Sequence, residues 1–403
     1  MKRRLLSVST LYPAPSRPGF GRFVETQLET LARRGDWEVT VINPIGLPPL
    51  PAALQPARYA ALAASPLIET PDGAHRSVTV HRPRFALIPG MSGWLNPALI
   101  TRAVLPLARR LHAETPFDLV DAQFFYPDGP AAARIARDLR LPLAIKARGA
   151  DIHYWGSRPR ALRQIRTAAD QARVLLAVSS ALADDMAALG LPRDRIRVHY
   201  TGLDHARFHP RPRDAARAEL AARLPALDLP PDARIVACVG ALIPRKGQDL
   251  AIAALGELPD DVVLVLVGAG AFEGALRDQA HASGLAARVR FAGQLGHDDL
   301  PLLLACAEAM VLPSSSEGLA NAWVEALASG TPVVIPDIGG ARELVDCAAA
   351  GRITAREPGA IAQGVAEVLA ARAPQAEVAA SAARFSWDAN AGALAALYDA
   401  ASA

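Results

Sequence analysis

The sequence lacks the features that mark secreted and membrane-spanning proteins. Among its 403 residues there are only three cysteines, Cys238, Cys306 and Cys347, which stand in apolar surroundings without the spacing of metal ligands. We expect packed free thiols in a reducing compartment, and therefore a cytoplasmic protein. No apolar run approaches the ~18 residues of a membrane span, so we expect at most peripheral association with the inner face of the plasma membrane.

Motifs for several other kinds of chemistry are missing as well. There is no Asp-x-Asp pair of the kind that holds a divalent metal, and Gly268-Ala269-Gly270 lacks the third glycine of a dinucleotide fingerprint. Internal repeats and low-complexity tracts are absent. The basic residues 2–4 resemble the start of a signal peptide, but the apolar run that follows ends at Ser9, so we expect a first β-strand there.

The charge is unevenly distributed, although the net charge is only +3. Residues 1–205 carry 27 Lys and Arg against 17 Asp and Glu, whereas the remaining residues carry 16 against 23. A basic first half suggests an anionic partner, such as a phospholipid surface or a phosphorylated acceptor. Arginines spread over solvated helices would explain the imbalance equally well. Because no basic stripe interleaved with aromatics is present, we expect no nucleic-acid partner.

Both halves alternate β-branched apolar segments with amphipathic ones, the pattern of parallel sheets covered by helices on both faces. We therefore predict an α/β protein with two Rossmann-like, doubly wound domains facing a cleft, and ligands beyond the carboxyl ends of the strands. The predicted strands are 5–9, 39–42, 119–121, 143–145 and 174–178 in the first half, and 235–239, 262–267, 289–292, 309–312 and 333–335 in the second.

Prolines divide the chain and suggest its domain limits. Those between residues 210 and 231 suit a linker, so we place the first domain at 1–209 and the second at 210–385. The proline-rich segment 44–71 is expected to be irregular at its start. A helix is expected at 97–113, and its arginines at positions 102, 109 and 110 could meet an anionic membrane, although ordinary amphipathic helices show the same pattern.

The most informative segment is 316–330, in which Glu317 and Glu325 flank a glycine turn and the start of a helix. The apolar run before it predicts a buried strand, and Gly330 ends the helix. A helix that opens after Gly318 directs free N–H groups and its positive dipole end toward an anion above the sheet. The nearby carboxylates can accept hydrogen bonds from sugar hydroxyls, so the segment is typical of a sugar-nucleotide site. Alternatively, the glutamates mark an exposed helix start favoured by the dipole.

Further glycine-rich turns follow other predicted strands. Gly19-Phe20-Gly21 leads into the helix expected at 22–33, where its backbone could approach a ligand closely, although such glycines are often required only by the turn. Residues 239–247 form a strand, a loop and a lysine–glycine pair, and residues 339–343 begin with two glycines.

Together, residues 239–247, 266–270, 317–325 and 339–343 resemble the nucleotide-sugar-binding domain of the retaining GT-B glycosyltransferases of family 4. The first half is similar more loosely, through 19–21, 178–179 and 201–208. The resemblance extends over essentially the whole chain. It implies that the C-terminal segment 386–403 forms a helix that returns to the first domain.

The resemblance also implies roles for individual residues. Lys246 would contact the diphosphate, Glu317 the donor sugar hydroxyls and Glu325 the ribose hydroxyls, with no metal required. Cations and helix N–H groups suit this chemistry because negative charge builds on the leaving phosphate. The remaining donor-binding candidates are Gly21, Gly318, Leu319, Ala320 and, for the base, Leu295.

Two positions depart from the family pattern. Ala241 stands where the family commonly has an arginine, and the neighbouring Arg245 could supply that guanidinium or could point to solvent. Arg148 stands in place of a histidine in the family's His-Gly-x-Asp, where it could reach a phosphate or sugar oxygen or could be a surface charge. We count Arg148 and Arg245 with the catalytic candidates. Gly19, Asp151 and His153 are candidates for the acceptor side.

The leading hypothesis is a retaining hexosyltransferase that uses a nucleotide diphosphate sugar and a hydroxyl acceptor. A lipid-linked or saccharide acceptor of surface polysaccharide assembly is suggested by the basic first half and by similarity of 121–129 and 148–151 to polysaccharide-assembly members. Two rivals stay open. One is a GT-B sugar-nucleotide epimerase or hydrolase, and the other is a noncatalytic nucleotide-sugar-binding partner of a membrane assembly.

Overall fold

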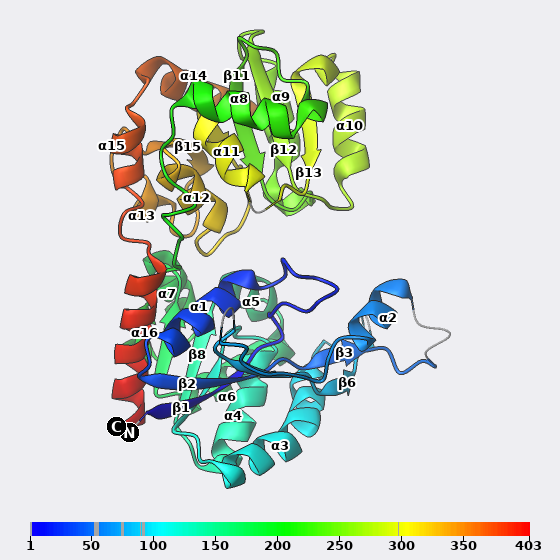
Figure 1. Cartoon of the computed structure of the whole chain (residues 1–403), viewed down its shortest axis with the longest axis vertical. Helices are drawn as coiled ribbons and strands as arrows, with labels where there is room; N and C mark the ends of the chain where they lie inside the picture. Colours follow the sequence, from blue (N-terminus) through cyan, green and yellow to red (C-terminus); the bar gives the residue numbers. More distant parts are fainter. Residues whose placement is uncertain (1, 52–55, 74–75, 89, 91–92, 297) are drawn as a thin grey trace. The chain divides into compact units, whose positions relative to one another are not determined.

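The computed structural model of the chain describes residues 2–51, 56–73, 76–88, 90, 93–296 and 298–403 (Figure 1). The chain forms two compact units. Unit 1 comprises residues 1–202 together with 387–403, and unit 2 comprises residues 203–386. Residues 203–209, which the sequence assigned to the first domain, belong to unit 2, and the C-terminal helix lies in unit 1.

Unit 1 is built on a mostly parallel sheet in the order β10-β9-β8-β7-β1-β2-β5-β4, in which only β4 is antiparallel to its neighbour. The strand order reverses next to β1, as in doubly wound folds. The sheet consists of β1 (Arg3–Val8), β2 (Trp37–Ile42), β4 (Ile68–Glu69), β5 (Thr79–His81), β7 (Leu119–Ala122), β8 (Leu143–Ala147), β9 (Val174–Ala177) and β10 (Ile196–Val198). A separate parallel pair is formed by β3 (Ile45–Leu47) and β6 (Arg84–Ala86).

Helices cover both faces of this sheet. On one face α3 packs against α4, and α4 against α6; on the other, α1 packs against α16 (Figure 1). The helices of unit 1 are α1 (Arg22–Arg33), α2 (Ala57–Ala63), α3 (Asn96–Glu114), α4 (Asp128–Leu139), α5 (Ala150–Gly156), α6 (Pro159–Gln171), α7 (Ser180–Ala188) and α16 (Trp387–Ser402).

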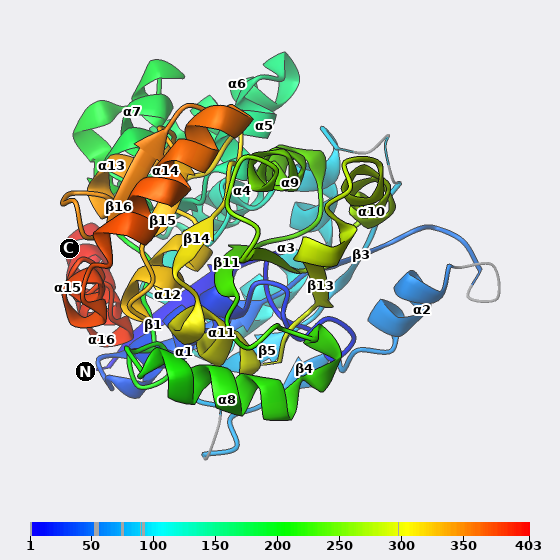
Figure 2. The same cartoon turned by 90° about the horizontal axis from the view of Figure 1, so that it is seen from above.

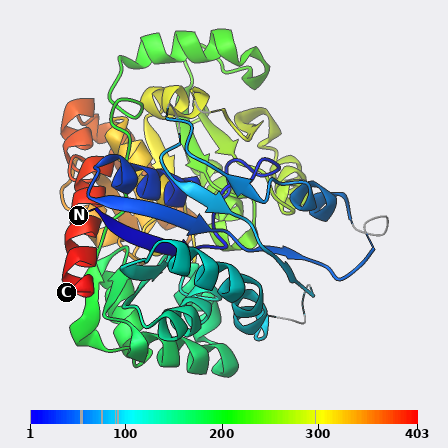
Figure 3. The ribbon, with the colours of Figure 1, turned by 60° about the horizontal axis from the view of Figure 1, so that its bottom comes forward.

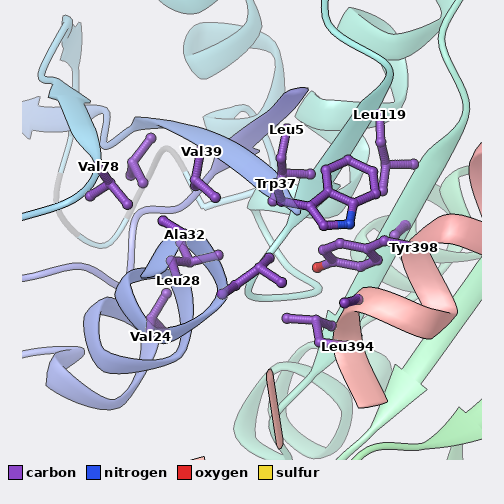
Figure 4. Packing of buried hydrophobic residues seen from close by; sticks show 14 of the residues in the cluster. Leu5, Val24, Leu28, Ala32, Trp37, Val39, Val78, Leu119, Leu394 and Tyr398 are labelled. Atoms are coloured by element: carbon purple, nitrogen blue, oxygen red, sulfur yellow. The ribbon is translucent and has the colours of Figure 1, made fainter. Parts of the chain in front are cut away.

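The core between α1, α16 and the sheet joins the two ends of the chain. Leu28 of α1 and Leu394 of α16 lie in one buried cluster with Trp37 and Tyr398 (Figure 4). The rings of Trp37 and Tyr398 meet edge to face with centroids 5.8 Å apart. The first strand and the last helix lie next to each other in unit 1 (Figure 3), and Arg3 forms a 2.9 Å ion pair with Asp399. The last helix is therefore part of the core of unit 1.

Unit 2 holds a fully parallel sheet in the order β13-β12-β11-β14-β15-β16. Helices α9, α10 and α14 cover one face, and α8, α11 and α12 cover the other (Figure 2). The strands are β11 (Arg234–Val239), β12 (Val262–Val267), β13 (Val289–Gly293), β14 (Ala309–Val311), β15 (Val333–Pro336) and β16 (Gly351–Thr354). The helices are α8 (Arg213–Arg223), α9 (Gln248–Leu255), α10 (Glu273–Ala282), α11 (Asp299–Cys306), α12 (Asn321–Ala328), α13 (Ala341–Leu344), α14 (Pro358–Ala371) and α15 (Gln375–Ala380).

The predicted fold class is confirmed, and three local predictions are wrong. The supposed linker contains α8, whose Ala216 and Leu220 are buried, because its prolines flank the helix and do not interrupt it. The start of the proline-rich segment 44–71 forms β3. Cys347 is exposed, unlike the other two cysteines. Among the described residues, no helix is long and apolar enough to cross a membrane.

Candidate functional site

The sequence motifs of unit 2 come together at the carboxyl edge of its sheet. Residues 240–247 follow β11, residues 268–270 follow β12, residues 313–320 follow β14 and residues 337–340 follow β15. Because β11, β12, β14 and β15 are parallel, these loops lie at one edge. The loop with Leu295 follows β13 at the same edge, and its leucine is half-buried.

Glycines let these loops approach one another closely. Gly247 has φ +74°, and a Cβ there would lie 2.2 Å from the carbonyl oxygen of Pro313. Gly339 has φ +49°, and its Cβ would lie 2.4 Å from the carbonyl oxygen of Glu317. Any side chain at either position would collide with backbone in a conformation that already disfavours it. The glycines thus hold the lysine loop and the double-glycine loop against the segment around Glu317.

A cluster of charges lies where the loop of residues 240–247 meets the segment around Glu317. Lys246 Nζ is 2.5 Å from Oε1 of Glu317, and an Arg245 guanidinium nitrogen is 3.4 Å from the same oxygen. The side chains of Lys246 and Glu317 are only 14% and 11% exposed. Arg245 is further fixed by a hydrogen bond to the carbonyl oxygen of Ser316. Two cations therefore converge on one carboxylate oxygen, and Arg245 points into the cluster, not away from it.

The start of α12 lies next to this cluster and presents unused donors. The backbone N–H groups of Leu319, Ala320, Asn321 and Ala322 donate to no acceptor among the described residues. Gly318 is held in place because its carbonyl oxygen accepts a 2.8 Å hydrogen bond from the N–H of Gly340. Unpaired N–H groups at a helix N-terminus favour an anion.

Glu325 projects from the second turn of α12 and is half-buried. Burial raises the pKa of its carboxyl to about 7, and the positive charge of Arg207 offsets part of that effect. Within the described part of the chain, its carboxylate accepts no hydrogen bond and forms no ion pair. An enclosed carboxylate with unused acceptor positions is suited to a ligand that donates hydroxyl groups.

The backbone of unit 1 itself requires a glycine at one position of the loop 19–21. Gly21 has φ +75° and begins α1, and a Cβ there would lie 2.6 Å from the carbonyl carbon and oxygen of Leu11. The position is therefore restricted to glycine without any ligand. Gly19 is exposed, and a Cβ there would meet no heavy atom within 4 Å.

Arg148 and Asp151 organise the loop after β8. The carboxylate of Asp151 accepts hydrogen bonds from the backbone N–H groups of Phe125 (2.6 Å), Arg148 (2.9 Å) and Gly149 (2.8 Å). Asp151 is fully buried, and its carboxylate holds the loop in place. Its assignment to the acceptor side stays a prediction. Burial lowers the pKa of the Arg148 guanidinium to about 10. Its Nε and a terminal nitrogen donate to the carbonyl and side-chain oxygens of Gln123 at 3.1 and 2.8 Å, so Arg148 is not a simple surface charge.

His153 and Lys146 of unit 1 lie in different surroundings, one near the surface and one buried. His153 faces Asp185, with Nε2 2.9 Å from a carboxylate oxygen, near the surface. Sequence reasoning missed Lys146, which is buried in β8 with Nζ 3.1 Å from the side-chain oxygen of Gln27 and 2.5 Å from Nδ1 of His199. A lysine inside an otherwise apolar strand was the signal that could have identified it. Among the described residues, no group of three or more His, Cys, Asp and Glu could hold a metal.

Two family models match the chain. Residues 18–207 match the model described as Glycosyltransferase Family 4, and residues 223–385 match the model described as Glycosyl transferases group 1. The two matched segments lie almost entirely in different units and together cover most of the sequence.

Curated relatives have related names. A Bacillus subtilis protein named as a teichuronic acid biosynthesis glycosyltransferase, TuaC, is 29% identical over 85% of this chain and 82% of its own. A GDP-mannose-dependent alpha-(1-6)-phosphatidylinositol monomannoside mannosyltransferase of Mycobacterium tuberculosis is 34% identical over 53% of this chain, and that match spans little more than half, 57%, of the mycobacterial protein.

Solved structures share the fold. The Anabaena protein HepE, crystallised with UDP and glucose, superposes with a TM-score of 0.72 at 22% identity, over 98% of this chain and 99% of that one. The sucrose-phosphate synthase of Thermosynechococcus elongatus superposes with a TM-score of 0.79 at 20% identity, over 99% of both chains. The chain therefore belongs to the GT-B glycosyltransferases, with a Family 4 first half and a group 1 second half.

Proposed function

We propose that this glycosyltransferase is a retaining, metal-independent hexosyltransferase that takes its sugar from a nucleotide diphosphate sugar. The observation that carries the proposal is the convergence of Lys246 and Arg245 on Glu317 beside the unpaired N–H groups of α12. Positive groups that suit a diphosphate thus lie next to a carboxylate that can accept hydrogen bonds from the hydroxyl groups of a sugar.

Lys246 can bind the diphosphate while it keeps its contact with Glu317. An ammonium has three donors, and the contact with Oε1 uses one of them, so two stay available for phosphate oxygens. As the bond from sugar to diphosphate breaks, negative charge builds on the departing oxygens. Lys246, Arg245 and the free N–H groups of α12 stabilise that charge, which is the work that a divalent ion performs in other enzymes.

The two glutamates would bind hydroxyl groups on either side of the diphosphate. Oε2 of Glu317 accepts no hydrogen bond from the described residues, which leaves it for a hydroxyl of the donor sugar. Glu325, in the second turn of α12, would accept hydrogen bonds from the ribose hydroxyls. The loop around Leu295 would contact the base. We assign no protein nucleophile to the retaining step.

The acceptor is proposed to be lipid-linked, in surface polysaccharide assembly at the inner face of the plasma membrane. The names of the relatives support this, since one refers to teichuronic acid and another to a phosphatidylinositol mannoside. The acceptor side would include the hollow of about 590 Å³ in unit 1 that Arg17, Arg58 and Tyr59 line. Arg148 and His153 stay candidates for this side.

Nucleotide release from UDP-, GDP- and ADP-sugars, with EDTA present, tests the donor site. Lys246→Met should lower release from the preferred donor by roughly 10²–10³-fold, the range for loss of one preorganised charge-stabilising group. Glu317→Gln should also lower release, because it removes the carboxylate that accepts from the donor sugar and holds Lys246 in place. Glu367→Gln, which removes an exposed partner of Arg352 in the same unit, is the matched control and should leave release unchanged. Full release in either site variant, or abolition by EDTA, would contradict the assignment.

The same assay separates the rivals. A transferase should release nucleotide faster when its acceptor is added, whereas a hydrolase should release it equally fast in water. An epimerase should convert the donor sugar without releasing nucleotide, and a noncatalytic binding protein should be stabilised by the donor without turnover. The anomeric coupling constant of the purified product, measured by NMR, decides between retention and inversion.

A further inference from the structure

Two adjoining hollows lie on the outer surface of unit 1 where α4, α5 and α6 meet the segment before α3. Their volumes are about 430 and 800 Å³, and they share Trp94, Arg160 and Arg163. The helices α3, α4 and α6 pack in succession on one face of the sheet (Figure 1), so the hollows belong to one continuous surface. We call this surface the arginine–aromatic face.

The charge of this face is entirely positive. No acidic residue lines either hollow, and the arginines that line them form no ion pair with any described carboxylate. These arginines are Arg134, Arg137, Arg158, Arg160 and Arg163. A terminal nitrogen of Arg134 is buried without a partner. Burial and the neighbouring charge of Arg137 lower the pKa of Arg134, and Tyr126 offsets part of that effect. Several like charges without counter-charges favour an anionic partner.

Exposed aromatic and aliphatic side chains accompany these charges. Trp94 and Tyr154 are 46% and 54% exposed, and Ile88 beside them is 43% exposed. The Arg160 guanidinium lies 5.1 Å from the Trp94 ring centroid, and that of Arg158 lies 3.5 Å from the Tyr154 ring centroid. Aromatic rings of this kind settle at the headgroup level of a bilayer, while arginines reach the lipid phosphates.

Two of the three arginines of α3 are differently placed. Arg109 forms an ion pair and two hydrogen bonds with Asp138, and Arg110 lies 3.8 Å from Glu114. Their charges are therefore largely compensated within the protein. The α3 helix, which the sequence singled out for membrane contact, is a weaker candidate than the surface formed by α4, α5 and α6.

We propose that the arginine–aromatic face docks on the surface of an anionic phospholipid bilayer. A soluble polyanion would be attracted by the same charges, but it would leave Trp94, Tyr154 and Ile88 without a role. The headgroup region of a bilayer accommodates both the charges and the apolar side chains. This inference deepens the proposed function, since an enzyme held on the membrane meets a lipid-linked acceptor there.

Co-sedimentation with phosphatidylcholine vesicles, with and without phosphatidylglycerol, tests the inference on the full chain. The double variant Arg160→Ala, Arg163→Ala should bind anionic vesicles about 30-fold more weakly, which corresponds to about 1 kcal/mol for each arginine. Arg109→Ala with Arg110→Ala removes the same charge from α3, where both arginines are paired with carboxylates, and should weaken binding by less than about threefold. Equal losses in the two double variants, or no binding of the unaltered chain, would overturn the proposal.

Trp94→Ala distinguishes a bilayer from a soluble polyanion. It should weaken binding to anionic vesicles, including the part that survives added salt, because that part depends on the apolar side chains. If binding to a soluble polyanion such as heparin is equally tight and Trp94→Ala leaves vesicle binding unchanged, the face binds polyanions and not membranes.

Nucleotide release without vesicles keeps the two proposals separate. The Arg160→Ala, Arg163→Ala variant should release nucleotide like the unaltered chain in solution and lose only its binding to vesicles. Vesicle binding without any release from a donor sugar would contradict the proposed function and leave the docking face standing. Release from a donor sugar without vesicle binding would contradict the docking face and leave the proposed function standing.

Discussion

Replacing Glu325 with glutamine should change how the stability of unit 2 depends on pH. Burial raises the pKa of this carboxyl to about 7 from 4.5, so between these values the folded protein holds a proton that the unfolded chain releases. The free energy of unfolding therefore falls as the pH rises through this window. A shift of this size corresponds to about 3 kcal/mol in total, of which about 2.5 kcal/mol is lost between pH 5 and pH 8.

The glutamine variant cannot ionise at this position and should escape that loss. Its unfolding free energy relative to the unaltered chain should rise by about 2.5 kcal/mol from pH 5 to pH 8, or by about 5–10 °C in the melting temperature of the unit. Other titrating groups are common to both proteins and cancel in the comparison. Glu367→Gln, at an exposed glutamate whose pKa Arg352 lowers, is the control and should show no such gain. A difference that stays constant within about 0.5 kcal/mol across this range would refute the burial of the Glu325 charge.

Nucleotide binding gives the same substitution a functional readout. If ribose hydroxyls donate to ionised Glu325, binding favours the charged form, which is about tenfold more populated at pH 8 than at pH 6. Thermal stabilisation by the nucleotide should therefore increase with pH more steeply in the unaltered chain than in Glu325→Gln. Parallel pH profiles for the two proteins would remove Glu325 from the ribose site.

Three further outcomes can be measured directly. Gly247→Ala should destabilise unit 2 by about 1–3 kcal/mol in denaturant unfolding, because its Cβ would collide with the Pro313 carbonyl; an unchanged midpoint would show that the loop can move apart. Tyr398→Phe keeps the ring but removes the hydroxyl that donates to buried Asp121, and should cost unit 1 about 1–3 kcal/mol. A thiol reagent should label Cys347 in the native protein and spare the two buried cysteines, in which burial raises the thiol pKa to about 12. Rapid labelling of all three would mean that the native state opens readily.

The buried strands of both sheets could be predicted because they are long apolar runs. The predicted segment 262–267 coincides with β12, and the helix expected at 22–33 coincides with α1. Strands β4, β5 and β10 were missed because they have only two or three residues and, unlike the equally short β14, do not lie in an apolar run. Prolines misled the prediction around α8, since the sequence alone did not show that they flank a helix.

The site of unit 2 was more predictable than that of unit 1. Each motif of unit 2 follows its own strand, so the parallel sheet alone brings Lys246 and Glu317 to one edge. Besides local contacts, Arg148 and Asp151 each have a partner more than twenty residues earlier in the chain, at Gln123 and Phe125 respectively. No local pattern specifies such a pairing, and the buried state of Asp151 follows only from the packed loops.

The place of α16 in the core has a consequence for the order in which the protein can fold as it is synthesised. Unit 2 is complete once residue 386 has been made, whereas unit 1 still lacks Leu394 and Tyr398 from its central cluster. Until then Trp37 and the inner face of α1 lack the part of their cover that α16 supplies, although they were made first. The half of the chain that leaves the ribosome first is therefore the last to become a finished domain.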